Sequence, residues 1–456
     1  MKKNSRIIRW LPLFSLFFLA PAHSEVQENF NTANSSGAAF SPAQPEVWVN
    51  VFIHGIFSIN PYSTLTNVLR FLNDNLLDSP YGETVATIRS DPFFFQNQAM
   101  QGLGLQPIDV QNYKTGNAAA LLAHIFEQAD ALNSPATHQN YYYTYGWSAL
   151  LSKSARYKDA KQLVLELNNL MLEFRQKGIT PKIRLLGFSH GGTLILKLAL
   201  VKCLEQLPFY FSVDQTFLIG TPIQFDTDYL INDPLFKSVY NIFSRSDRAQ
   251  NLDFFSCGHF FSSKVFSPHC GFEELPSKLI QLDIRLLRKK GEACKPYTLC
   301  DATQPLLFDG RKCKKSVRNV SPGHTELWFF GWTPLNYRKT FPFYPLPVVA
   351  FLPFIANAIA PIAHNTIPER PITVTIDPRR DSMIFTIPHC KQVFCGNFVG
   401  IQNFLALKQE ALLYQPHPDI YNWNVFNLQI QANYQKALKA LKERKCYNKI
   451  SACGCK

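Results

Sequence analysis

Short apolar runs alternate along this chain with longer segments in which apolar residues recur at helical spacing. Predicted strands occupy residues 47–53, 141–145, 183–186, 216–219, 239–243 and 279–286, and predicted helices occupy 62–77, 118–132, 157–177 and 194–200. Buried parallel strands read as continuous apolar runs, and helix-sized crossovers between them place helices on both faces of a sheet. The pattern therefore predicts an α/β fold with a doubly wound, mostly parallel sheet.

The pattern changes beyond residue 335. Residues 341–363 are almost wholly apolar but contain five prolines, and each proline removes a backbone donor, which argues against a transmembrane helix. The segment is interpreted as a lid, an interfacial surface or a flap over the core. Residues 372–376 and 383–387 resemble a hairpin, and 423–445 resemble a helix. We expect a first domain over 46–334 and a C-terminal extension over 335–456, for which a lid or cap is one role.

The N-terminus has the three-part layout of a secretory signal peptide. Lys2, Lys3, Arg6 and Arg9 precede a short apolar stretch at 10–20, and small residues at 22–24 offer a cleavage site. A retained membrane anchor is the alternative, but the stretch is short for a span of about 20 residues. We expect cleavage after Ser24, a flexible lead-in over 25–45, and a location outside a bacterial cytoplasm: secreted, or in the periplasm or cell envelope.

Composition excludes several classes of protein. Charged residues make up only 17% of the chain and phenylalanine occurs 38 times, so the chain is neither disordered nor an acidic tail. The formal net charge is +13, of which the N-terminal segment carries four, leaving about +9 for the rest. That excess favours anionic surfaces such as phospholipid headgroups. Because no dense basic stripe interleaved with aromatic residues is present, we expect no nucleic-acid partner.

Eleven cysteines support export, because loop cysteines usually pair in an oxidising compartment. Cys203 lies on an apolar predicted helix and is expected to be a buried free thiol. The other ten would allow five disulfides that staple the insertions, and sequence does not fix their connectivity. They are Cys257, Cys270, Cys294, Cys300, Cys313, Cys390, Cys395, Cys446, Cys453 and Cys455. Locally plausible pairs are Cys257 with Cys270 and Cys390 with Cys395; a zinc site using His259 and His269 beside the first pair is the alternative.

The motif Gly187-Phe-Ser189-His-Gly191, followed directly by Gly192, lies between a predicted strand and a predicted helix. A serine on such a tight turn needs glycines around it, because a Cβ there would collide with neighbouring backbone. The turn presents the serine hydroxyl above the sheet, at the positive end of the helix. Ser189 is therefore the candidate nucleophile, weighed against a chance match of a short pattern.

A serine nucleophile needs a base, and the base needs a carboxylate that orients it. In sheets of this type these partners follow the serine from loops after later strands. Asp247 follows the strand at 239–243 and is the preferred acid, with Asp226 and Asp228 in reserve. His324 follows the last predicted strand and is the preferred base. The histidines considered less suitable are His259, His269, His364, His389 and His417.

Two backbone N–H groups are expected to stabilise the oxyanion. One belongs to His190, directly after the nucleophile, and the other to Ile56, which follows the first strand in His54-Gly55-Ile56. Gly55 permits the tight turn that aims the Ile56 N–H at the reacting oxygen. The side chains of His54 and His190 are interpreted as structural hydrogen-bonding groups rather than bases. This chemistry uses no cofactor or metal, and none is expected.

Taken together, His54-Gly55, the serine motif, Asp247 and Pro322-Gly-His324 resemble the α/β-hydrolase family, with bacterial lipase-like and inositol-deacylase-like serine esterases as the nearest types. The resemblance covers roughly residues 46–330. It implies Ser189 as nucleophile, Asp247 as acid and His324 as base in a two-step acyl-enzyme mechanism. The insertion at 80–138, the cysteine-rich stretch at 287–320 and the C-terminal extension depart from a minimal member of the family.

The leading expectation is a secreted serine hydrolase that cleaves carboxylic esters, with a lipid or another acyl ester as substrate and a possible lipid interface as partner. Amide hydrolysis and acyl transfer use the same machinery and stay open. One alternative is a catalytically silent hydrolase scaffold that serves as an envelope or host-interaction protein. Another is an envelope protein cross-linked between chains by its C-terminal cysteines.

Overall fold

The computed structural model describes residues 46–57, 79–114, 117–133, 138–247, 249–251, 262–269, 272–289, 317–331, 341–365, 367–387, 392–414 and 423–453. The expected signal peptide and lead-in, the expected helix at 62–77, the expected domain boundary between 334 and 335, and most of the cysteines lie outside these residues. The account that follows concerns the described part of the chain.

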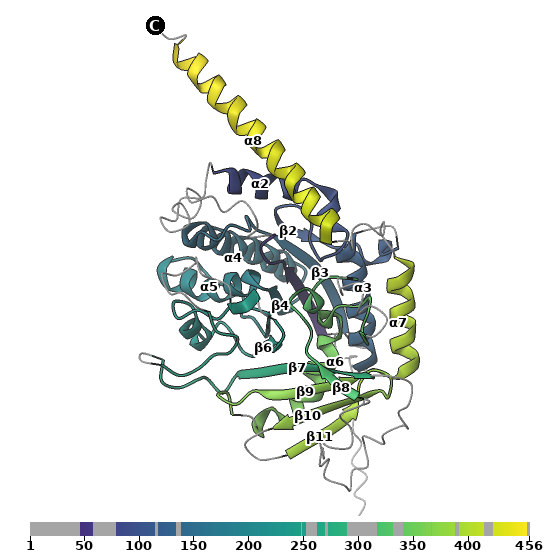
Figure 1. Cartoon of the computed structure of the whole chain (residues 1–456). Helices are drawn as coiled ribbons and strands as arrows, with labels where there is room; N and C mark the ends of the chain where they lie inside the picture. The colour runs from purple at the N-terminus through teal and green to yellow at the C-terminus, as the bar shows by residue number, and fades with distance from the viewer. Residues whose placement is uncertain are drawn as a thin grey trace, which may run out of the picture. The chain divides into compact units, whose positions relative to one another are not determined.

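The described residues form one sheet of eleven strands (Figure 1), in the order β11-β10-β9-β7-β6-β5-β4-β1-β3-β2, with β8 paired to β7 off this path. Their bounds are β1 (Glu46–Ile53), β2 (Gly104–Pro107), β3 (His138–Gly146), β4 (Lys182–Phe188), β5 (Gln215–Ile219), β6 (Val239–Phe243), β7 (Leu279–Lys289), β8 (Val317–Val320), β9 (Ile372–Asp377), β10 (Ser382–Ile387) and β11 (Gln392–Asn397). The run from β3 through β9 is parallel, whereas β2, β8, β10 and β11 pair in the antiparallel sense. A large, mostly parallel sheet was expected, and the structure confirms it.

Central strands form from the apolar runs because both of their faces are covered. In β1, Val49, Val51 and Ile53 belong to the core on one face, whereas Phe52 belongs to the core on the other. Successive side chains of a strand point to opposite faces, so an apolar residue at every position requires two cores. The expected strands at 47–53, 141–145, 183–186, 216–219, 239–243 and 279–286 correspond to β1 and β3–β7.

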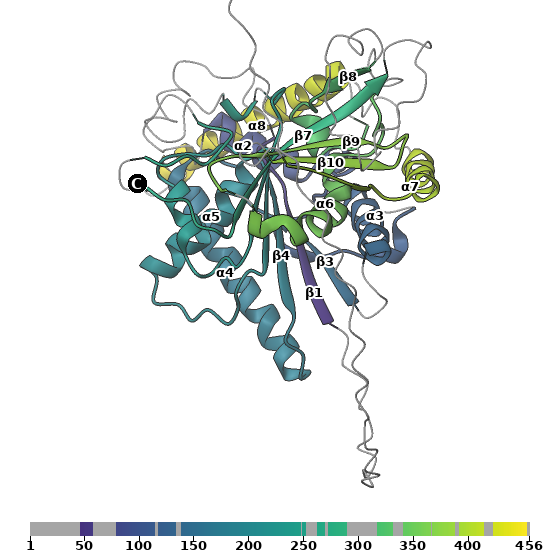
Figure 2. The same cartoon turned by 90° about the horizontal axis from the view of Figure 1, so that it is seen from below.

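Helices cover both faces of the sheet, as Figure 2 shows. Residues of α4 (Lys153–Gln176) and α5 (His190–Leu204) share one core, and residues of α3 (Ala118–Asn133) and α6 (Leu352–Ile359) share the other. Helix α4 begins where the Ser152 hydroxyl accepts a hydrogen bond from the Ala155 N–H at 3.2 Å, which satisfies a donor left free at a helix start. The two hydrophobic cores therefore lie on opposite faces of the sheet, each under its own helices.

The apolar segment over 341–363 packs into the core, as the flap interpretation expected. It includes the 3-10 helix η6 (Val348–Phe351), α6 and part of η7 (Ala360–Asn365). Phe343 stacks on Phe398 with ring centroids 5.6 Å apart and contacts Phe351 at 4.6 Å. The expected hairpin is confirmed as β9 and β10, and β9 adds to the parallel sheet beside β7.

Helix α8 (Trp423–Cys453) packs against α2 (Pro80–Arg89) and the 3-10 helix η1 (Pro92–Phe95). Phe426 meets Phe94 edge to face at 5.2 Å, and the amides of Gln429 and Asn433 both donate to Asp91. Helix α7 (Ile401–Leu413) adds to the core over α3 and α6 through Phe404. No helix among the residues described here is both long and apolar enough to cross a bilayer.

The structure describes only some of the cysteines, so it tests only part of what was expected of them. Cys203 has no disulfide, but it is exposed near the end of α5, so the expectation that it is buried was wrong. The helix is apolar around it, yet its last turn reaches past the edge of the core. Cys395 lies exposed on β11, and its expected partner Cys390 falls outside the described residues. No disulfide joins two cysteines that the structure describes, and the expected bridges stay predictions.

Candidate functional site

Ser189 occupies the sharp turn between β4 and α5 with φ of 52° and ψ of −127°, a conformation that non-glycine residues rarely adopt. Its N–H donates to the Ile219 carbonyl at 2.8 Å, which holds the turn against the neighbouring strand β5. A Cβ added at Gly191 would lie 2.5 Å from the Ile53 carbonyl oxygen, so the turn is packed against the end of β1. The expected need for glycines around the serine is confirmed.

The loop after β1 passes directly beside this serine. A Cβ added at Gly55 would lie 2.8 Å from the Ser189 Cβ and 3.1 Å from the Phe188 ring. Only glycine allows such an approach of one backbone to another. The next residue, Ile56, was expected to supply one oxyanion donor, and the structure places its backbone adjacent to this contact. His190, the other expected donor, is the first residue of α5 and so has a backbone N–H at the positive end of the helix.

Asp247 lies in the loop after β6 and is fully buried. Its Oδ1 accepts hydrogen bonds from the N–H groups of Ala249 at 3.0 Å and Gln250 at 3.3 Å, at the start of the 3-10 helix η4 (Ala249–Asn251). These bonds leave the other oxygen, Oδ2, to face the base. The Lys264 ammonium donates to the carbonyls of Ser244 and Arg245 at 3.1 and 2.9 Å, which fixes the loop from the opposite side.

His324 lies in the loop after β8, just before the 3-10 helix η5 (Thr325–Leu327), and its Nδ1 is 2.7 Å from Asp247 Oδ2. Because the carboxylate only accepts, Nδ1 carries the proton and Nε2 is left as the basic nitrogen. The Ser244 hydroxyl donates to the Pro322 carbonyl and so ties the two loops together. The His324 side chain keeps 21% of its surface exposed, whereas the Asp247 side chain has none.

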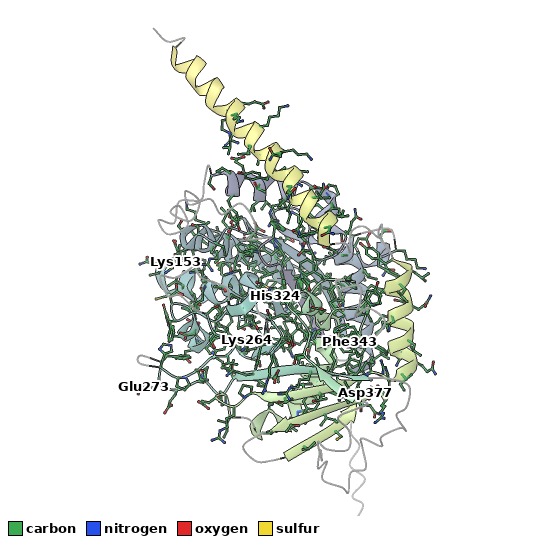
Figure 3. The ribbon with its side chains drawn as sticks, viewed as in Figure 1. Lys153, Lys264, Glu273, His324, Phe343 and Asp377 are labelled. Atoms are coloured by element: carbon green, nitrogen blue, oxygen red, sulfur yellow. The ribbon has the colours of Figure 1, made fainter. Side chains whose placement is uncertain are left out.

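The structure brings these three groups to one edge of the sheet. The ring of Phe188, the residue before Ser189, packs against the His324 ring with centroids 4.6 Å apart. A Cβ added at Gly220 would lie 3.1 Å from Asp247 Oδ2 and 3.2 Å from His324 Nδ1, and Gly220 follows the residue that binds the Ser189 N–H. Figure 3 marks His324 and Lys264 among the side chains. The serine, the acid and the base therefore converge.

Behind the loop that carries Gly55 lies a buried arginine that the sequence analysis missed. Arg89 comes from the end of α2, and its Nη2 is 2.6 Å from His54 Nε2 and also donates to the Trp147 carbonyl. Burial, with the nearby guanidinium second, lowers the pKa of His54 well below its usual value of 6.5. Burial also lowers the pKa of Arg89 to about 10, so the arginine stays charged at neutral pH.

The neutral His54 ring is fixed in one tautomer. Since Nε2 accepts from Arg89, Nδ1 carries the proton, and it donates to the Gly55 carbonyl at 2.6 Å. The Trp147 indole N–H donates to the His54 carbonyl at 2.7 Å. His54 therefore holds the backbone of its own loop, which agrees with its interpretation as a structural group.

A second buried arginine holds the other histidine of the two motifs. Arg156, on α4, places Nη1 3.2 Å from His190 Nδ1 and is itself fully buried. The two arginines flank the strand-to-helix turn from two different segments, the 80–138 insertion and α4. The sequence did not indicate that these two arginines are buried, because a single arginine in a helical segment usually lies in solvent.

The two reserve candidates for the acid form ion pairs with residues other than His324. Asp226 pairs with Lys153 at 3.1 Å, and Asp228 pairs with His269 at 2.8 Å. His259, His389 and His417 fall outside the described residues, as do Cys257 and Cys270 of the zinc alternative, and the structure does not describe the His364 side chain. Among the described residues, no group of three or more His, Cys, Asp or Glu side chains is placed to hold a metal ion.

One further carboxyl lies beside the base. Burial raises the pKa of Glu326, two residues after His324, and the nearby Asp247 carboxylate raises it further. Its Oε2 accepts a hydrogen bond from the Thr325 hydroxyl at 3.1 Å. The Glu326 carboxyl therefore takes up a proton at a higher pH than an exposed glutamate does.

Comparison with models of known protein families, with curated proteins and with solved structures finds no match to this chain.

Proposed function

We propose that this protein is a serine hydrolase of the α/β-hydrolase type that cleaves carboxylic esters. The observation that supports it most is the 2.7 Å hydrogen bond between His324 Nδ1 and Asp247 Oδ2, beside a serine in a strained strand-to-helix turn. A serine, a buried carboxylate and an imidazole, in this order along the chain and in loops after successive strands, match the requirements of nucleophilic acyl transfer.

In the first half of the reaction, His324 Nε2 takes the proton of the Ser189 hydroxyl as its oxygen attacks the ester carbonyl. The negative charge of Asp247 stabilises the imidazolium that forms, and its two backbone hydrogen bonds keep it from rotating away. The oxyanion of the tetrahedral intermediate accepts hydrogen bonds from the N–H groups of Ile56 and His190. Each such donor contributes about 3 kcal/mol of barrier reduction.

The ester C–O bond then breaks as the protonated His324 gives its proton to the leaving alcohol, and the acyl group stays on Ser189, which completes the first half of the reaction. A water molecule then enters, gives its proton to the same imidazole and attacks the acyl carbonyl. The carboxylic acid leaves and Ser189 recovers its hydrogen. No cofactor takes part in either half, because the serine and histidine carry every proton and the acyl group.

The substrate proposal is an acyl ester, with lipids included, and the protein is proposed to act outside the cytoplasm. The N-terminal layout of basic residues, apolar stretch and small residues supports export. The residual positive charge supports an encounter with anionic lipid surfaces.

The test is labelling of the full chain with a fluorophosphonate probe, which reacts with an activated serine. We expect the probe to label the native protein and not Ser189→Ala. A panel of short- and long-chain p-nitrophenyl esters should likewise be hydrolysed by the native protein and not by Ser189→Ala. Ser246→Ala, a serine of the acid loop, is the matched control and should still label. Absence of labelling in a folded native protein would favour the silent scaffold, and labelling of Ser189→Ala would remove the nucleophile.

A further inference from the structure

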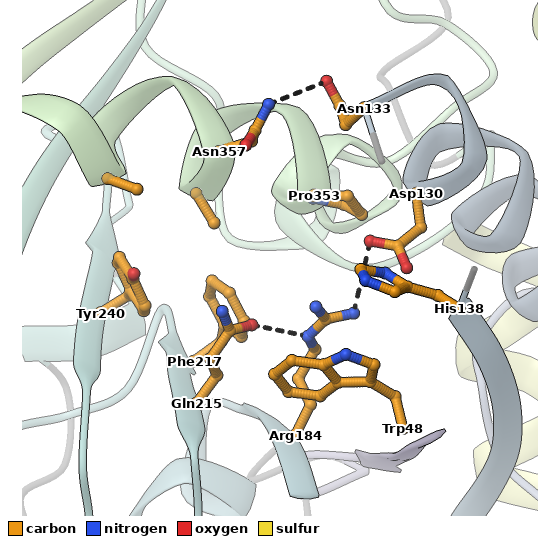
Figure 4. A pocket seen from close by; sticks show the side chains of 12 residues that line it. Trp48, Asp130, Asn133, His138, Arg184, Gln215, Phe217, Tyr240, Pro353 and Asn357 are labelled. Atoms are coloured by element: carbon orange, nitrogen blue, oxygen red, sulfur yellow. Dashed lines mark hydrogen bonds and ion pairs between the residues drawn. The ribbon is translucent and has the colours of Figure 1, made fainter. Parts of the chain in front are cut away.

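A cavity of about 160 Å³ lies at the amino ends of the central parallel strands. Its walls come from the first residues of β1, β3, β4, β5 and β6, and from α3 and α6, as Figure 4 shows. The residues that line it are Trp48, Asp130, Asn133, His138, Arg184, Gln215, Phe217, Tyr240, Pro353, Ala356, Asn357 and Ala360. Arg184 precedes Ser189 by five residues on an extended strand, so the cavity is about 16 Å from the serine. It is separate from the proposed active site.

The cavity is lined by the carboxylate of Asp130, the imidazole of His138 and the guanidinium of Arg184, and an anionic ligand would bind the guanidinium. Its Nε donates to Gln215 Oε1 at 2.7 Å and its Nη1 donates to Asn50 Oδ1 at 3.0 Å. The group lies over the Trp48 ring, 4.4 Å from the centroid, and only 7% of the side chain is exposed. These contacts hold the guanidinium plane in one orientation before any ligand arrives, so little entropy is lost on binding.

Arg184 still has donors to offer. The third nitrogen, Nη2, has no hydrogen-bond partner among the described residues, although Arg184 lines the cavity. The Asp130 carboxylate is 3.7 Å from Nη1, too far for a hydrogen bond, and it accepts instead from Asn140 at 3.2 Å. The Asp130 carboxylate therefore forms an ion pair with Arg184 without a hydrogen bond, and Nη2 keeps its N–H groups for a ligand.

The remaining lining fixes the size and polarity of the ligand. Phe217, Pro353, Ala356 and Ala360 are apolar, and the amides of Asn133 and Asn357 lie 3.5 Å apart. A volume of about 160 Å³ is large enough for a benzene-sized molecule. A carboxylate pairs well with a guanidinium, and the apolar wall suits a hydrocarbon group attached to it.

We infer that this cavity binds a small monocarboxylate, with its carboxylate on Arg184 Nη2 and its hydrocarbon part against Phe217 and α6. No residue of the proposed active site takes part, so the inference stands apart from the esterase proposal. A neutral ligand with a single carbonyl oxygen is the competing occupant.

The test uses the full chain carrying Ser189→Ala, so that turnover plays no part, and titrates it with 4-fluorobenzoate observed by fluorine NMR. We expect saturable binding that weakens by about ten- to a hundredfold in Arg184→Gln, because a charged hydrogen bond is lost. Ala356→Leu provides a second test that does not depend on the folding of Arg184→Gln: it fills the cavity and leaves the guanidinium in place. Ala358→Leu, on the same helix but outside the cavity lining, is the matched control.

Binding in the control together with loss in Ala356→Leu supports the site. Absence of saturable binding, or equal binding by Ala356→Leu and Ala358→Leu, overturns it. 4-Fluorobenzamide has the same shape without the charge. If it binds as tightly as the carboxylate, the cavity selects a carbonyl group and the carboxylate inference is wrong.

Discussion

Substitution of Gly55 by alanine tests whether the loop after β1 serves the serine. The added Cβ would lie 2.8 Å from the Ser189 Cβ and 3.2 Å from the Phe188 carbonyl oxygen. Carbon atoms in contact prefer separations of about 3.5 Å or more, so the loop has to move away by about 0.7 Å. The loop carries the proposed Ile56 donor, and displacement of about 1 Å in a catalytic group can cost a hundredfold in rate.

We expect kcat/KM of Gly55→Ala on a p-nitrophenyl ester to fall about a hundredfold or more, close to the loss of one oxyanion donor. Overpacking should lower the free energy of unfolding by about 1–3 kcal/mol, so circular dichroism and a thermal melt must first show that the variant is folded. Gly102→Ala is the matched control, because a Cβ there meets nothing within 4 Å. A folded Gly55→Ala as active as Gly102→Ala would refute the placement of this loop beside the reacting carbonyl.

Three further predictions concern the groups around the serine. Asp247→Asn should lower kcat about a thousandfold or more, because an amide does not hold the His324 tautomer or stabilise its cation; near-normal kcat would remove Asp247 as the acid. Burial lowers the pKa of His54, so below about pH 6.5 the unfolded chain binds a proton that the folded chain does not bind. Urea titrations should therefore show the free energy of unfolding falling by up to about 1.4 kcal/mol per pH unit as the pH drops. His54→Asn should give a flatter profile. A parallel profile would contradict this. Arg156→Met removes the hydrogen bond from Arg156 to His190 Nδ1 and should lower the free energy of unfolding by about 1–3 kcal/mol in a urea titration. Unchanged stability would show that this contact does not stabilise the fold.

The sequence predicted the elements of the sheet and the chain order of the candidate site for a local reason. Buried parallel strands are apolar on both faces, so their runs stand out, and a serine between glycines at a strand end marks a turn that only those residues permit. Asp247 was chosen because it follows β6 directly, and the structure shows it bound to His324. Both choices needed only the order of elements along the chain.

Other features had no local signal. Strands β2 and β8 have only four residues each, and β11 is the outermost strand at one end of the sheet, where the apolar pattern of a buried strand is weaker. The positions of Arg89 and Arg156 inside the protein depend on which helix faces the turn, and a single arginine on a helix usually lies in solvent. The exposure of Cys203 likewise depends on where the core ends, not on the apolar residues beside it.

The order of strands and helices, the serine turn and the choice of Asp247 and His324 as candidate acid and base thus came from the amino-acid sequence itself, because each rests on the local pattern around a strand or turn and on the order of elements along the chain. Only the tertiary structure decided that two buried arginines hold the histidines beside that turn, and that Arg184 faces a cavity at the other end of the sheet. Those arrangements join segments tens to more than a hundred residues apart, such as Asn50 with Arg184. The packing of the whole sheet selects such contacts, and no stretch of the chain specifies them alone.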